Sequence, residues 1–79
     1  MEHRSDRIAV SNAKLETLCT LYLQQHARCR IVKRVSIRRH AAGWPNWEVA
    51  CIEPRLSIVA DHVARQLIAE LQNEFRMAE

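Results

Sequence analysis

The sequence predicts an α+β fold in the order helix, strand, strand, helix, with an antiparallel hairpin packed on one face by two helices. Three observations predict it. Apolar residues recur with helical spacing towards both ends of the 79-residue chain, two central segments alternate apolar and polar residues, and the only glycine lies between those segments. A chain of this length forms one domain, 1–79, because either half alone would bury too little apolar surface. We expect residues 1–10 to fray.

The first helix is predicted to begin at Ser11 or Asn12, since either side chain can cap a helix. Asp6 is an alternative start, which would place Ile8 on the buried side, so the start stays open. The helix should end near Ala27 or Arg28. Residues on its apolar face follow three-and-four spacing: Leu15, Leu18, Cys19, Tyr22 and His26.

The first strand is predicted within Arg28–His40, which holds six of the twelve Lys and Arg residues and no acidic residue. With a two-residue period one face of the strand is apolar and the opposite face is basic. The apolar face carries Ile31, Val35 and Ile37, and the basic face carries Arg30, Arg34 and Arg38.

The second strand is predicted from Trp47 to Ile52, stopped by Glu53 and Pro54, after a turn over His40–Asn46 that holds Gly43. Trp47, Val49 and Cys51 form its apolar face. The two strands make a hairpin in which the expected opposite residues are Ile37 with Val49, Val35 with Cys51, Arg38 with Glu48 and Arg34 with Ile52.

The second helix is predicted from Pro54 or Ser57 onward. Its apolar stripe is Leu56, Ala60, Val63, Leu67, Leu71 and Phe75, widened by Val59, Ala64 and Ile68. A two-stranded sheet is marginal alone and leaves two open edges, so pairing of edges across a two-fold axis predicts a homodimer.

The composition predicts a cytoplasmic protein. Three cysteines without paired spacing argue against a disulfide framework and for a reducing compartment. No apolar run approaches the length that a bilayer crossing needs, so we expect no membrane association. The net charge of +3 is unevenly placed, with the basic segment in the middle of the chain.

The candidate contact residues are Arg30, Arg34, Arg38, Arg39 and Trp44. Arginines two residues apart along a strand stand about 7 Å apart, near the spacing of phosphates, which suggests a phosphate-binding surface. The simpler interpretation is a solvated sheet face on which arginine guards an edge. Of the two tryptophans, Trp44 in the turn is the better candidate for partner contact and Trp47 for packing. The simpler interpretation is that both pack in the core or at its rim.

No catalytic or metal-binding signature is present. His26 and Cys29 form the only close pair of metal-ligand types, whereas a structural zinc site needs two such pairs. Cys51 is expected on the packed face, where burial makes a thiol inert. We therefore expect no enzyme, no metal and no cofactor.

Gly43, Asn46, Trp47 and Val49 form the pattern Gly-x-x-Asn-Trp-x-Val, which is followed later by Leu-Gln-x-Glu-Phe at Leu71–Phe75. This pattern resembles small uncharacterised bacterial proteins of about this length. The resemblance implies a compact bacterial domain and transfers no functional residue.

Two functional hypotheses follow. The favoured one is a small non-enzymatic interaction or regulatory module, dimeric, that binds another protein through its sheet edge or the Trp44 loop. The alternative is a nucleic-acid-binding module that uses the basic strand Arg28–His40.

Overall fold

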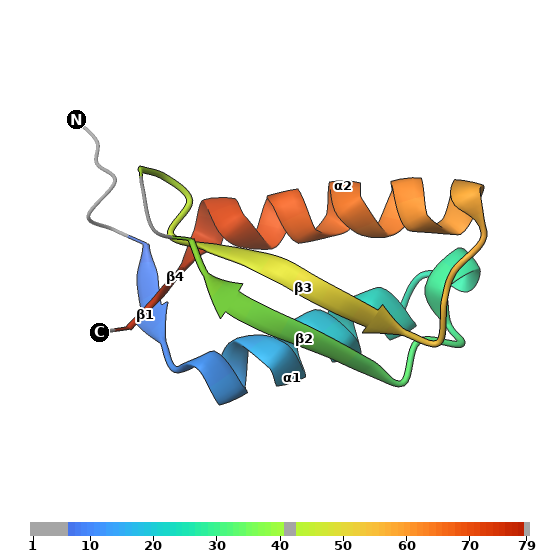
Figure 1. The fold of residues 1–79 in the computed structure, drawn as a ribbon, viewed down its shortest axis with the longest axis horizontal. Helices are drawn as coiled ribbons and strands as arrows, with labels where there is room; N and C mark the ends of the chain where they lie inside the picture. Colours follow the sequence, from blue (N-terminus) through green and yellow to red (C-terminus); the bar gives the residue numbers. More distant parts are fainter. Residues whose placement is uncertain (1–6, 41–42, 79) are drawn as a thin grey trace.

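The computed structural model describes residues 7–40 and 43–78 and confirms an α+β fold. Two helices, a short 3-10 turn and four strands follow one another along the chain (Figure 1): β1 (Ile8–Val10), α1 (Asn12–Gln24), η2 (Ala27–Cys29), β2 (Arg34–Arg39), β3 (Trp47–Glu53), α2 (Ile58–Glu74) and β4 (Phe75–Met77). In the view of Figure 1, α2 runs along β3 and α1 runs along β2. The β1 and β4 strands lie together at one end of the molecule, and η2 lies at the other.

The strands form two separate pairs, and this corrects the predicted four-element arrangement. β2 pairs with β3 antiparallel, as expected, but β1 pairs with β4 in parallel. The alternative start at Asp6, which would have placed Ile8 on the buried side of a helix, is wrong: Ile8 is exposed in β1 opposite Phe75. Phe75 begins β4 instead of ending the helix. Of the segment expected to fray, residues 1–6 lie outside the described residues, and 8–10 form a strand.

The first helix begins as predicted and ends earlier. Ser11 caps it, with its hydroxyl accepting from the Lys14 backbone N–H at 3.1 Å. It ends at Gln24, because His26 takes an extended backbone and its Nδ1 accepts from the Arg28 N–H. His26 is therefore not part of the helical stripe.

The predicted first strand begins six residues too early. Residues 28–33 belong to η2 and the turn that follows it, and β2 starts at Arg34. Cys29 and Val32, three residues apart, are buried, while Ile31 is 59% exposed. The Gln24 side chain fixes this turn by donating from Nε2 to the Val32 carbonyl at 2.7 Å. The strand was predicted here because the charged residues alternate with apolar ones, and the same alternation is typical of a strand.

The register of the hairpin holds only as far as a β-bulge. Ile37 pairs with Val49 and Arg38 with Glu48, as predicted, but the register shifts between Ser36 and Ile37. The extra residue is Ala50. The remaining observed partners are Ser36 with Cys51, Val35 with Ile52, and Arg34 with Glu53.

The bulge moves Cys51 to the outer face. An extra residue reverses the side on which every later side chain of the strand lies. Cys51, predicted to pack, is exposed, and Ile52 takes its place opposite the buried Val35. The predicted pairs of Val35 with Cys51 and of Arg34 with Ile52 are wrong for this reason.

The core is one cluster to which both helices and the hairpin contribute. Its α2 residues are Ala64, Ile68 and Leu71, and Ala60 is buried on the same side of the helix. Val63 and Leu67 therefore flank the buried face instead of centring it. Ser57 caps α2 by accepting from the Ala60 N–H at 3.1 Å. The largest fully buried side chains are those of Trp47, Leu15, Leu23, Val32, Val35, Cys19 and Cys29.

Hydrogen bonds from Asn46 and Trp47 tie the hairpin to β4. Asn46 Nδ2 donates to the Met77 carbonyl and Asn46 Oδ1 accepts from the Met77 N–H, both at 3.0 Å. Trp47 Nε1 donates to the Phe75 carbonyl at 3.1 Å, and Gln72 Nε2 donates to the Trp47 carbonyl at 2.8 Å. The Asn-Trp and Leu-Gln-x-Glu-Phe parts of the sequence pattern therefore meet, which gives that pattern a structural role.

The turn before these residues contains the one described position that needs glycine. Gly43 has φ of 70°, in the left-handed region that side chains disfavour. Residues 41 and 42 of the predicted turn lie outside the described residues.

Candidate partner-binding groove

The outer face of the hairpin carries two of the candidate arginines, and both lie beside acids. Arg38 Nε is 2.7 Å from Glu48 Oε2, and Arg34 is the register partner of Glu53. Opposite charges across a strand pair neutralise one another at the sheet surface. The outer face is therefore not a row of free cations.

The other two candidate arginines point elsewhere. Arg30 follows η2 and is not on a strand, and Arg39 Nη2 donates to the Ala78 carbonyl at 3.1 Å. The structure does not bring the four arginines into one row with the spacing of phosphates.

The two tryptophans differ as predicted in burial. Trp47 is fully buried, which confirms its packing role, and Trp44 is 44% exposed. The guanidinium carbon of Arg7 lies 4.1 Å from the centroid of the Trp44 ring, a cation–π contact that covers part of the indole.

The two edges of the hairpin differ in how they are protected. On β2, the Ile37 N–H donates to Glu16 Oε2 of α1 at 3.0 Å, and α1 packs along this strand. On β3, the Trp47 carbonyl accepts a hydrogen bond from Gln72 Nε2 of α2. Within the described residues no further strand pairs with β3, so its edge beyond Trp47 is open. A carboxylate that turns inward onto an edge is a common way to block strand addition.

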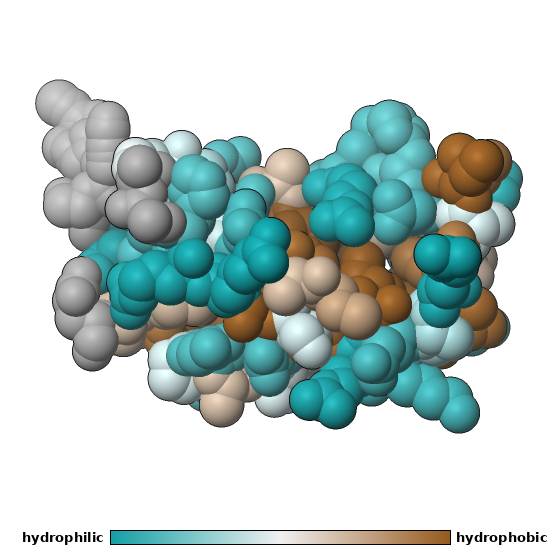
Figure 2. Space-filling model, in the orientation of Figure 1, coloured by the Kyte–Doolittle hydropathy of each residue, from teal (hydrophilic) through white to brown (hydrophobic). Residues whose placement is uncertain are grey.

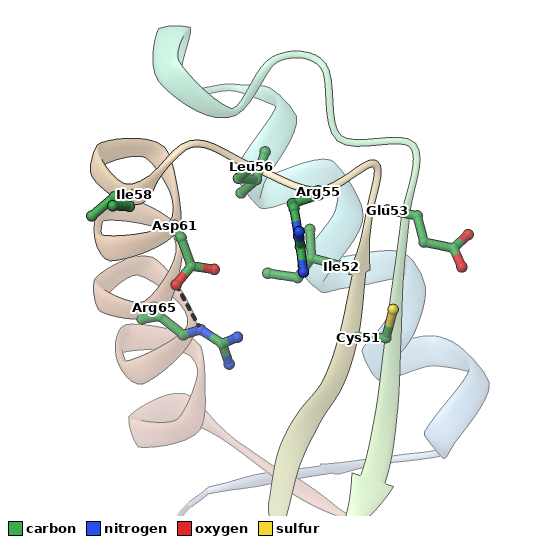
Figure 3. A pocket seen from close by; sticks show the side chains of 8 residues that line it. All are labelled: Cys51, Ile52, Glu53, Arg55, Leu56, Ile58, Asp61 and Arg65. Carbon is green, nitrogen blue, oxygen red and sulfur yellow. Dashed lines mark hydrogen bonds and ion pairs between the residues drawn. The ribbon is translucent and has the colours of Figure 1, made fainter.

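A groove adjoins this open edge, between β3 and the first turns of α2. It has a volume of about 550 Å³. In Figure 3, Ile52 and Arg55 extend into the gap towards α2, whereas Cys51 and Glu53 point away from the helix. We call this hollow the β3–α2 groove; its lining residues are Cys51, Ile52, Glu53, Arg55, Leu56, Ile58, Asp61 and Arg65.

The apolar part of the groove continues onto the surface. Ile58, the first residue of α2, is 90% exposed, and the neighbouring Val59 is 55% exposed. In Figure 2, apolar side chains gather between α2 and β3 and again at the end of the molecule where α2 begins. Exposed apolar surface next to an open strand edge is typical of a site that a partner covers.

Two of the three thiols, Cys19 and Cys29, and the Tyr22 hydroxyl have raised pKa values. Burial, with the charge of Glu16 adding to it, raises the pKa of Cys19 to about 12, and burial also raises the pKa of Cys29. The hydrogen bond that Tyr22 donates to Glu70 raises the pKa of that tyrosine. All three groups are held protonated at neutral pH, which disfavours nucleophilic or basic roles.

His26 and Cys29, the one close pair of metal-ligand types in the sequence, both make structural hydrogen bonds. His26 caps η2, and the Cys29 thiol donates to the Ala60 carbonyl at 3.6 Å, so both members of the one close pair have structural roles. Across residues 7–40 and 43–78, no three His, Cys, Asp or Glu side chains gather in a way that could hold a metal ion.

Sequence reasoning missed the groove, including Arg55, Ile58 and Arg65. One signal was present: Ile58 lies on the side of the helix opposite the predicted stripe, so an apolar residue there had no assigned packing partner. No sequence pattern could place it beside β3, because the chain reverses direction between Glu53 and Ile58.

Comparison with known proteins identifies no relative of this chain. No family model matches the chain, and neither curated proteins nor solved structures give a match. In the described part of the chain, no helix has both the length and the apolarity to cross a bilayer.

Proposed function

We propose that this chain is a small non-enzymatic interaction module that binds an extended segment of a partner protein in the β3–α2 groove. The observation that carries the proposal is the open edge of β3 beside a hollow of about 550 Å³. An extended segment can add to such an edge through backbone hydrogen bonds, with alternate side chains entering the hollow. We place the module in the reducing cytoplasm, where its three free cysteines stay reduced.

A single extended segment fits this site better than a second copy. α2 flanks the open edge of β3, as Figure 1 shows, so a two-fold axis through that edge would bring two α2 helices against each other. A separate segment meets only one helix. The homodimer predicted from the sequence stays a prediction, and it would have to use β3, because Glu16 occupies the edge of β2.

The experiment is selection of random twelve-residue peptides, displayed on phage, against the full chain. Selected peptides are then titrated calorimetrically into the wild type, Ile58→Ser and the control Leu21→Ser. Both residues are exposed and apolar, but only Ile58 lines the groove. Burying part of an isoleucine contributes about 1.4 kcal/mol, so Ile58→Ser should weaken binding by about tenfold.

The result that would overturn the proposal is a set of peptides that binds Ile58→Ser as tightly as the wild type, or no selected peptide at all. Sedimentation of the free protein tests the second copy as occupant. A stable dimer whose interface is disrupted by Ile58→Ser would assign the groove to self-association instead.

The nucleic-acid alternative rests on the exposed Arg34 and Arg38, and the acids opposite them weaken it. Salt titrations with duplex and single-stranded DNA and RNA test it. Binding that Arg34→Gln/Arg38→Gln weakens, with a shallower salt dependence, would favour this alternative over the peptide groove.

A further inference from the structure

We infer that the partner segment carries a carboxylate, which Arg55 and Arg65 bind at the β3–α2 groove. This inference rests on the proposed function and names the chemistry of the segment that the groove takes. The observations that carry it are the charges of the groove and of the surface around its open end.

Cations outnumber acids among the side chains that face the hollow. Arg55 and Arg65 line it from the connector and from α2, and Figure 3 shows Arg55 extending into the gap on the side that faces Arg65. Glu53, although part of the rim, points away from α2 and lies opposite Arg34 in the strand register. Asp61 is thus the only acid of the lining that faces the hollow.

Asp61 does not neutralise both arginines. Its Oδ2 is 3.5 Å from Arg65 Nε, a long contact between two exposed side chains one helical turn apart. An ion pair between exposed side chains on one helix is weak, because water screens both charges. The terminal nitrogens of Arg65 and the whole guanidinium of Arg55 can therefore take up a further carboxylate, in the planar geometry that arginine favours.

The surface beyond the groove has the same sign. η2 packs against α2, and the exposed Arg28, Arg30 and Lys33 lie in or just after η2. The positive end of the α2 dipole lies at the same end of the molecule. An acidic segment is therefore attracted along its whole approach, while the exposed Ile58 and Val59 offer it apolar contacts.

The test uses the selected peptides and two variants with equal changes of charge. Arg55→Glu/Arg65→Glu, the groove variant, reverses the charge of the two arginines in the groove. Lys14→Glu/Arg38→Glu, the control, makes the same change of net charge at exposed residues away from the groove. Wild-type selection should enrich Asp and Glu beside alternating apolar residues. Affinity for these peptides should fall at least about tenfold in the groove variant and less than about threefold in the control. Selection against the groove variant should enrich Lys and Arg.

Synthetic peptides with a free or an amidated C-terminus separate the two sources of the carboxylate. Amidation should weaken binding only if the terminal carboxylate is the bound group. Two results would overturn this inference and leave the proposed function standing. The selected peptides could depend on Ile58 but show no enrichment of acidic residues, or they could bind the groove variant as tightly as the wild type. Failure to enrich any peptide would overturn both.

Discussion

The hydrogen bonds between Asn46 and β4 predict a large effect from a small substitution. Asn46→Ala removes both bonds to Met77 and leaves the Met77 N–H and carbonyl unpaired in a partly buried site. Each lost bond removes about 1 kcal/mol of net stability, and each unpaired group adds up to about 1 kcal/mol in this setting, which totals about 2 to 4 kcal/mol. A domain of this size has about 4 to 12 kcal/mol in all, so the change is a large fraction of its stability.

Urea unfolding, followed by tryptophan fluorescence, measures this effect. With a slope of about 1 kcal/mol per M, the midpoint should fall by about 2 to 4 M. Asn46→Asp keeps an acceptor for the Met77 N–H and loses only the donor to the carbonyl, so its midpoint should lie between those of the wild type and Asn46→Ala. Asn73→Ala, an exposed asparagine on α2, is the control and should change little.

If Asn46→Ala lowered the free energy of unfolding by less than about 0.5 kcal/mol, the two hydrogen bonds would not contribute as we propose. It would mean that β4 holds its place without the hairpin turn. The structural role that we assign to the Asn-Trp pattern would then be wrong.

Three further outcomes are expected. Cys51 should react with a thiol reagent within the mixing time, while Cys19 and Cys29 stay protected until the chain unfolds; equal rates for all three would contradict the bulge. Leu71→Ala should lower the free energy of unfolding, measured in urea, by about 2 to 5 kcal/mol, and the exposed control Leu21→Ala should lower it by less than about 0.5 kcal/mol. Equal losses in the two variants would mean that Leu71 is not on the buried face of α2. Stability should fall above about pH 9: the folded state keeps the Cys19 proton up to a pKa of about 12, whereas an ordinary thiol loses it near 9.0, which gives a loss of about 1.4 kcal/mol per pH unit. In urea midpoints measured from pH 7 to 10.5, Cys19→Ala should remove that share of the slope, and an unchanged slope would contradict the burial of this thiol.

The elements predicted well are those whose residues repeat a period over several turns or pairs. α2 follows one stripe for four turns, and the pairs Ile37 with Val49 and Arg38 with Glu48 lie next to the turn that sets the register. β1 and β4 were missed because strands of three residues have too few positions to show a period.

The bulge was missed for a different reason. Val49, Ala50, Cys51 and Ile52 are all small or apolar, so the sequence does not show on which side each one lies. Inserting Ala50 as the extra residue exchanges the roles of Cys51 and Ile52 without changing the pattern of letters. Ile52 is thereby directed towards α2, and this shift helps to create the groove.

The candidate contact residues reflect the same limit. Counting charges found the arginines of β2, but the acids that face them come from β3 and were only partly anticipated in the predicted pair of Arg38 with Glu48. The groove itself joins residues from β3, the connector and α2, and their proximity depends on the packing of α2.

The most direct measurement of strand addition at β3 is an NMR spectrum of the full chain with a selected peptide. We expect backbone NOEs between the peptide and Val49–Glu53, with slower amide exchange along that edge and shifted signals at Ile58 and Arg65. NOEs to the Arg34 and Arg38 face, to the Trp44 turn or to β1, with the β3 edge unchanged, would contradict it.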